Sequence, residues 1–172
     1  ELRALWDDKA AEGFHCSAFP KGHVPTDYER WWTAEEPYAV SYCMHYEPYV
    51  IMRKASVPAY DERFRGYGMN KISHIMEVAA AGSSFLVLPK VFITALEHAR
   101  SAAWRHAFGP QRDPSHTLRL AYVMGAFKRD LLLRYGHTAL GGMLAREASS
   151  GHTALGGVLA QEASSGHTGG ML

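Results

Sequence analysis

The chain has 172 residues, and its 18 basic and 17 acidic side chains leave a formal net charge of +1. This length suggests one domain, or part of a larger one. The balanced charge argues against a broad basic surface that binds nucleic acid or membranes. Hydrophobic residues make up 47% of the chain, which is enough for a sizeable core.

Sequence features that indicate cellular location are few in this chain. No apolar run reaches the ~18 residues of a membrane span, and no signal peptide is visible. The chain starts with Glu1 rather than methionine, which suggests a fragment or a processed product. The two cysteines, Cys16 and Cys43, allow one disulfide bond without predicting it.

The first part of the chain favours short helices around a loop. Residues 1–15 are predicted to be helical because three apolar side chains recur at helical spacing, Leu2, Leu5 and Trp6. Residues 19–27 contain proline and glycine and are expected to form a loop. A second short helix is expected at 28–32, with Thr26 or Asp27 as its N-cap.

Four segments have the composition of strands or apolar runs. Residues 38–43 and 48–54 are rich in Tyr and Val and are predicted to be strands. Pro48 fits a strand start or an edge. Residues 85–88 are predicted to form a buried strand, and a further apolar run follows at 91–96.

Two longer helices are predicted. The first covers 71–81, with one apolar face formed by Ile72, Ile75, Met76 and Ala79. Asn70 is expected to cap it by accepting the Ser73 backbone N–H, and Gly82 fits the position just past its end. Residues 99–114 are expected to be irregular. The second helix is predicted over 117–135.

The tail differs in kind from the rest, so the chain is divided into 1–136 and 137–172. Residues 136–150 and 151–165 are near-copies of one 15-residue repeat. Paired glycines and Ser-Ser-Gly junctions weaken a helix, which predicts a low-complexity tail, mostly disordered or loosely helical. Its recurring histidines are explained by repeat duplication rather than by a metal array: His137, His152 and His167.

The junction before the first long helix carries the strongest functional signal. Gly66 and Gly68 flank Tyr67 and permit a close approach of the backbone to a ligand. The helix N-terminus that follows offers free backbone N–H groups. The two together suit a polar or anionic ligand, with nearby polar groups from Asp61, Glu62, Asn70 and Lys71. The alternative is a plain loop-to-helix junction, and the pattern is not a dinucleotide fingerprint.

A set of co-linear motifs makes the chain resemble the glycosyltransferase family 49 domain, in particular the C-terminal glucuronyltransferase domain of LARGE-type proteins. The resemblance covers roughly residues 1 to 136 and includes the ending LLLRYG at 131–136. The matching motifs are KGHVPT (21–26), EPY (36–38), EPYVIMRK (47–54), YDERFRGYGMNK (60–71), HIME (74–77) and VLP (87–89).

The resemblance implies an α/β fold, the C-terminal part of a GT-A mixed sheet with flanking helices. It also implies an inverting transfer from a nucleotide sugar, expected to be UDP-glucuronate, assisted by a divalent metal such as manganese. The expected acceptor is a xylose-containing glycan on a glycoprotein such as dystroglycan. The expected location of the full-length protein is the Golgi, through a membrane anchor that this chain lacks.

The same resemblance places the junction beside the donor and acceptor sugars. It implies that Gly66 and Gly68 border them, that Tyr67 stacks on a sugar ring, and that Asn70 and Lys71 hydrogen-bond to sugar hydroxyls or a carboxylate. Many inverting relatives have an acid just after the glycines, where this chain has Asn70 and Lys71, so Asn70 is a catalytic candidate by position.

A base must also remove the proton of the acceptor hydroxyl. Asp61 or Glu62 is the candidate for that role. Arg63 or Arg65 suits the carboxylate of a glucuronate, and a solvated run of charges is the alternative interpretation.

The chain departs from the family pattern in its metal-binding residues. It has Asp7 and Asp8 in a row and no Asp-x-Asp. Ala95 stands where the family has a metal-binding histidine, and His98 is the candidate that would replace it. We therefore also consider a fragment or pseudoenzyme that binds glycans or has a structural role. A metal-binding protein is disfavoured because the ten histidines show no ligand spacing.

Overall fold

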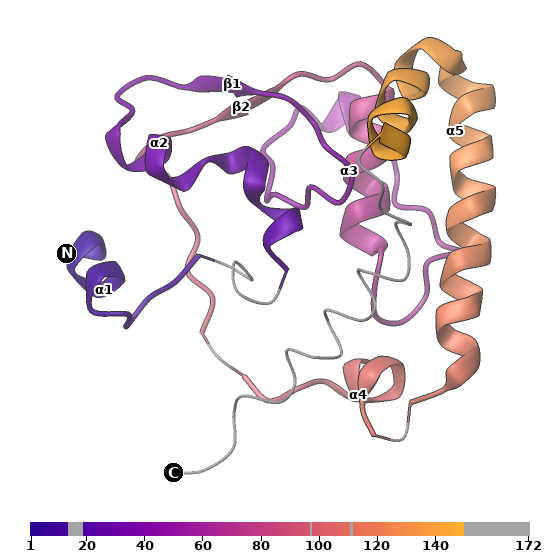
Figure 1. The fold of residues 1–172 in the computed structure, drawn as a ribbon, viewed down its shortest axis with the longest axis horizontal. Helices are drawn as coiled ribbons and strands as arrows, with labels where there is room; N and C mark the ends of the chain where they lie inside the picture. The colour runs from indigo at the N-terminus through magenta and orange to yellow at the C-terminus, as the bar shows by residue number, and fades with distance from the viewer. Residues whose placement is uncertain (14–18, 97, 111, 150–172) are drawn as a thin grey trace.

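The computed structural model describes residues 1–13, 19–96, 98–110 and 112–149 (Figure 1). Its long C-terminal helix runs along one side, a shorter helix lies beside it, and a pair of short strands crosses one end. The elements in chain order are α1 (Leu2–Asp7), η1 (Pro20–Gly22), η2 (Val24–Thr26), α2 (Tyr28–Thr33), β1 (Tyr38–Val40), η3 (Lys54–Ser56), α3 (Asn70–Ala80), β2 (Phe85–Val87), α4 (Ala102–Phe108) and α5 (Pro114–Ser149).

The first helix is shorter than predicted. α1 ends at Asp7, because Lys9 adopts a left-handed backbone (φ 57°) that a helix cannot continue through. Residues 14–18 lie outside the described residues. The prediction for α2 is confirmed, and its N-cap is Asp27, whose carboxylate accepts the Arg30 backbone N–H at 3.1 Å.

The described residues form one antiparallel pair of strands, β1 and β2, with Tyr38 opposite Val87. The predicted strand at 48–54 is wrong: the segment pairs with no strand in the described part of the chain and leads into η3. β2 was predicted correctly, although Leu86 points to solvent instead of being buried. The apolar run at 91–96 forms neither helix nor strand and is exposed.

α3 starts one residue earlier than predicted, and this corrects the role of Asn70. Met69 is the N-cap residue, with a left-handed backbone (φ 65°), and its carbonyl accepts the Ser73 N–H at 2.8 Å. Asn70 is the first helical residue. The predicted end is confirmed: Gly82 has φ +86° and its N–H bonds to Ala79 O, while the next N–H bonds to Val78 O, which together form a Schellman motif.

The segment 99–114, predicted to be irregular, contains the helix α4. Ser101 caps it, because its hydroxyl accepts the Trp104 backbone N–H at 3.1 Å. The helix ends at Gly109, where an added Cβ would lie 2.5 Å from the Arg105 carbonyl oxygen. Local capping therefore defines a helix where the sequence predicted irregular structure.

α5 begins three residues before the predicted 117, at Pro114. Asp113 accepts the Ser115 backbone N–H at 2.8 Å and supplies the N-terminal cap. The prediction to residue 135 is confirmed, and Gly136 interrupts the helix with φ 78° and ψ 168°. Helical backbone resumes at 137–149, and the rest of the repeat tail lies outside the described residues.

The core lies between α3 and α5, which stand side by side in Figure 1. α3 is buried on nearly every side, including Ile72, Ile75 and Met76 of the predicted apolar face. Four α5 side chains spaced by three or four residues cover it: Leu120, Met124, Phe127 and Leu131. This packing fixes the junction that precedes α3 against α5. No helix among the described residues is both long and apolar enough to span a bilayer.

Candidate functional site

The candidate site is the segment 60–71, here called the glycine junction, which leads into α3. Gly66 (φ +84°), Gly68 (φ +101°) and Met69 (φ +65°) all have left-handed backbone, so the chain turns sharply there. Phe64 and Met69 are buried in the core and anchor the two ends of the turn. At Gly68 an added Cβ would lie 3.2 Å from Leu120 Cδ1, so the close approach seen here is to α5.

Two α5 side chains hold the backbone of the junction. His116 Nε2 donates to the Tyr67 carbonyl at 2.8 Å, because a carbonyl oxygen can only accept. Arg119 donates to the carbonyls of Arg65 at 2.5 Å and Arg63 at 3.4 Å. Sequence reasoning missed both residues, since neither belongs to a motif near the glycines. The junction is therefore a fixed turn.

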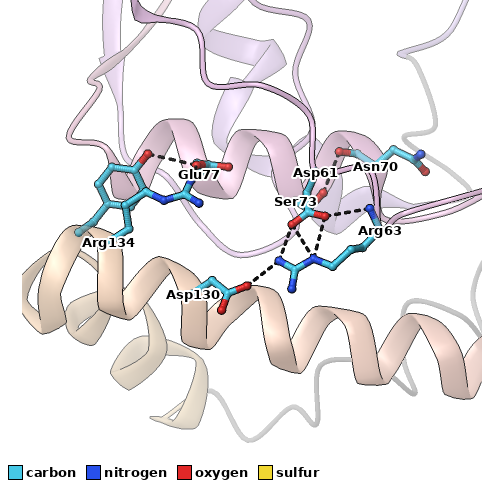
Figure 2. A network of polar contacts seen from close by, with 8 residues as sticks. Asp61, Arg63, Asn70, Ser73, Glu77, Asp130 and Arg134 are labelled. Carbon is cyan, nitrogen blue, oxygen red and sulfur yellow. Dashed lines mark hydrogen bonds and ion pairs between the residues drawn. The ribbon is translucent and has the colours of Figure 1, made fainter.

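Tyr67 and Asn70, both predicted to contact a sugar, take part in this bracing. The Tyr67 ring is half-buried and meets Phe108 edge-on, with ring centroids 5.7 Å apart. The Asn70 side-chain amide donates to the Phe64 carbonyl at 3.0 Å. The Asn70 backbone carbonyl accepts from the Ser73 hydroxyl at 3.0 Å (Figure 2). The Asn70 side chain thus closes the turn back onto its own start.

Lys71, in the first turn of α3, contacts the segment 47–49. Its ammonium is 3.6 Å from the Glu47 carboxylate and 4.9 Å from the centre of the Tyr49 ring. Burial raises the pKa of Glu47, and the Lys71 charge partly offsets this. His23 Nε2 lies 3.8 Å from the same carboxylate. Sequence reasoning missed Glu47, although an acid between aromatic residues in HYEPY was a signal for a buried carboxylate.

Asp61 faces α5 and is held by a guanidinium. Arg63 donates to its carboxylate from Nε at 2.9 Å and from Nη2 at 2.5 Å, and bridges to Asp130 at 2.7 Å (Figure 2). These hydrogen bonds lower the pKa of Asp61, so its carboxylate is ionised at neutral pH. Arg63, predicted to pair with a glucuronate, is thus already placed between two carboxylates of the chain.

An open groove of about 540 Å³ runs along this face of the junction. It brings together Asp61, Glu62, Arg63 and Arg65 from the junction with Arg119 and Val123 from α5. Arg65 is exposed there and donates from Nε to the Glu62 carbonyl at 3.3 Å. The groove offers carboxylates and guanidiniums to a polar ligand. It does not include Asn70 or Lys71.

The metal-binding role predicted for His98 gains no partners from the part of the chain that the structure describes, and it stays a prediction. His98 is exposed, and its Nδ1 contacts the carbonyl of the neighbouring Ala99 at 2.9 Å. Ala95, where the resemblance led us to expect a histidine, is exposed in the same irregular segment. Among the described residues, no three His, Cys, Asp or Glu side chains gather in a way that could hold a metal ion.

Comparison with known proteins agrees with these motifs. The sequence profile of a family described as "Glycosyl-transferase for dystroglycan" matches residues 1–135. A two-stranded sheet among helices is compatible with an α/β glycosyltransferase domain. The chain belongs to glycosyltransferase family 49.

The relatives are bifunctional enzymes by name. The chain is 41% identical over 143 residues to "Xylosyl- and glucuronyltransferase LARGE2s" of Gallus gallus, covering 81% of this chain and 18% of the relative. It is 39% identical over 140 residues to the Homo sapiens LARGE2 protein of that name, with 81% and 19% covered. The chain is 34% identical over 149 residues to Homo sapiens LARGE1, an alignment that covers 87% of this chain and 19% of the relative. The chain thus spans about a fifth of the length of these curated relatives.

Proposed function

We propose that this chain is the C-terminal part of a GT-A glycosyltransferase domain that transfers a sugar, expected to be glucuronate from UDP-glucuronate, to a glycan on a protein. The observation that carries the proposal is the family match over residues 1–135 together with the fixed glycine junction. The names of the relatives support a glucuronyl or xylosyl donor. A Golgi location and a xylose-containing acceptor belong to the same proposal.

In this reaction an acceptor hydroxyl oxygen forms a bond to the anomeric carbon as the bond from that carbon to the diphosphate breaks. Attack from the opposite face inverts the configuration. The hydroxyl proton passes to a base, for which we propose Asp61, whose ionised carboxylate lines the groove. Arg63 orients this carboxylate through its two hydrogen bonds. The junction backbone, held by His116 and Arg119, keeps the groove in one shape.

A divalent cation, expected to be manganese, would stabilise the leaving nucleotide. Because the described residues do not form a site for it, no step of the reaction is assigned to such an ion on this chain. A glycan-binding or structural role without catalysis is the second candidate, and Ala95 at the position of the family histidine favours it.

The direct test is sugar transfer by the complete protein in which this chain occurs. We expect glucuronate to move from UDP-glucuronate to a xylose-terminated glycoside in the presence of Mn²⁺, detected by mass spectrometry. UDP-xylose serves as the alternative donor. Failure with both donors, in a protein that is folded by circular dichroism, would favour the non-catalytic role.

The role of Asp61 is tested in the same protein. Asp61→Asn is expected to lower kcat by 10² to 10⁴, on the scale of a lost general base, with little change in KM for the donor. Glu62→Gln, which alters the neighbouring exposed acid, is the matched control and should keep kcat within about threefold. If both variants lose the same activity, or neither does, Asp61 is not the base.

A further inference from the structure

A second hollow lies between α3, α5 and the start of the junction, and it adjoins the groove along the glycine junction because Asp61 and Arg63 line both. Its volume is about 320 Å³, within the range of small-ligand pockets. We propose that this hollow, here called the Tyr60 pocket (lined by residues 58–61, Arg63, Glu77 and the α5 segment 127–135), binds one neutral pyranose ring of a glycan.

The polar groups of the pocket come from three elements that the fold brings together. Glu77 on α3 is 4% exposed, and its carboxylate accepts from Arg134 and, at 3.1 Å, from the Tyr135 hydroxyl. Asp61 and Asp130 sit at the other end, joined through Arg63. Figure 2 shows the two networks in the space between α3 and α5. Carboxylate acceptors beside guanidinium donors match vicinal hydroxyls, which both donate and accept.

The apolar and aromatic surfaces suit the body of a sugar ring. Phe127 and Leu131 form the apolar side of the pocket, and Tyr60 and Tyr135 line its walls. The Tyr60 ring is 56% exposed and lies flat on the buried His74 imidazole, with centroids 4.0 Å apart and planes 6° apart. This stacking fixes the Tyr60 ring in place, so an aromatic face is available without an ordering cost.

The charge of the pocket decides which sugar it takes. Its lining carries the three carboxylates Asp61, Glu77 and Asp130 against the two guanidiniums Arg63 and Arg134, a net charge of −1. Burial lowers the pKa of His74, so the imidazole under Tyr60 is neutral at pH 7 and adds no positive charge. An acidic sugar would therefore meet a surplus of carboxylate, whereas a neutral sugar would not.

Assigning this ring to the acceptor glycan rests on the proposed function, but the preference for a neutral ring does not. The probes are methyl β-D-glucopyranoside and methyl β-D-glucopyranosiduronate, which differ only in the carboxylate at C6. We expect titrations followed by amide chemical shifts to give at least about threefold tighter binding of the neutral glycoside. The amide signals that shift on addition of the glycoside should belong to residues 58–63 and 127–135. Equal or tighter binding of the glucuronide, or shifts elsewhere, would overturn the proposal.

Two variants separate the contribution of the aromatic ring of Tyr60 to binding from the contribution of the Asp130 carboxylate to selectivity. Tyr60→Ala is expected to weaken binding of the neutral glycoside by about fivefold or more. Tyr122→Ala, which removes an exposed tyrosine of α5 outside the pocket, should leave it unchanged. Asp130→Asn, at a side chain that is 44% exposed, should reduce the ratio of the affinity for the neutral glycoside to the affinity for the glucuronide. Unchanged binding in Tyr60→Ala, or an unchanged preference in Asp130→Asn, would contradict the pocket.

Binding and transfer are distinguishable outcomes. A protein that transfers sugar normally but does not bind the neutral glycoside would remove the pocket and leave the proposed function standing. A protein that binds the glycoside at this pocket but transfers nothing would keep the pocket and remove the function.

Discussion

Gly66 and Gly68 share a left-handed backbone but have different surroundings. A Cβ at Gly66 would meet nothing nearer than His116 Cε1 at 3.8 Å, an ordinary contact. A Cβ at Gly68 would lie 3.2 Å from Leu120 Cδ1, in the tightly packed core. The two positions therefore separate the cost of backbone strain from the cost of lost space.

We predict that Gly66→Ala lowers the free energy of unfolding by about 1 kcal/mol, the cost of a left-handed backbone at a residue with a Cβ. Gly68→Ala should lower it by about 2 kcal/mol or more, because Leu120 must also move. Urea denaturation measures both. Equal losses at the two positions would mean that Leu120 yields freely and that the junction is not tightly held against α5.

Asn70 lies at the start of the helix as predicted, but its role there differs from the predicted one. It was predicted as the helix cap because an Asn before an apolar run has that role most often. Met69, which has a left-handed backbone, is the N-cap residue instead. The Asn70 side-chain amide donates to the carbonyl of Phe64, six residues earlier. Its predicted catalytic role stays a prediction.

At the scale of elements, the packing of α5 on α3 positions the junction. Side chains at helical spacing on one face of α5 are buried, while others on the same helix are exposed. Leu131 is 1% exposed and Leu133 is 87% exposed, two residues apart on the same helix. They form a matched pair of the same residue type.

Leu131→Ala is expected to lower the free energy of unfolding by 2–5 kcal/mol, because it leaves a cavity in the core. Leu133→Ala should change it by no more than about 0.5 kcal/mol. Guanidinium denaturation with a shared m-value provides the comparison. A large effect at Leu133 would show that this face of α5 is covered in solution, and no effect at Leu131 would contradict the packing described here.

At the scale of the whole molecule, stability should depend on pH through buried imidazoles. Burial lowers the pKa of His45 to about 4, with the charges of Lys128 and Lys21 acting in the same direction. The folded state thus prefers neutral His45. Its contribution is fully present above the unfolded pKa of about 6.5 and is lost as the pH falls through about 4. The lowered pKa of His74 acts with the same sign.

We predict a loss of about 2–3 kcal/mol in unfolding free energy from His45 alone between pH 7 and pH 4. His45→Asn should flatten this part of the curve, since asparagine does not titrate and tolerates the left-handed backbone (φ 76°) at this position. Denaturation at several pH values measures the slope. An equally steep curve in the variant would assign the acid loss to other groups.

The sequence by itself determined the elements whose signals are local. α2, the end of α3 at Gly82 and most of α5 follow from caps, glycine and apolar spacing, all of which act within a few residues. The family, too, followed from the sequence, because its motifs are read along the chain. The roles predicted for Asp61, Lys71 and His98 remain predictions.

Only the tertiary structure decided the features that depend on partners far along the chain. The segment 48–54 has strand composition, but a strand needs a neighbour, and among the described residues β1 pairs with β2 alone. The pairing of Glu47 with Lys71, and of Glu77 with Arg134, joins residues 24 and 57 positions apart. No local pattern encodes such distances, because burial and charge pairing are set by packing once the helices have met.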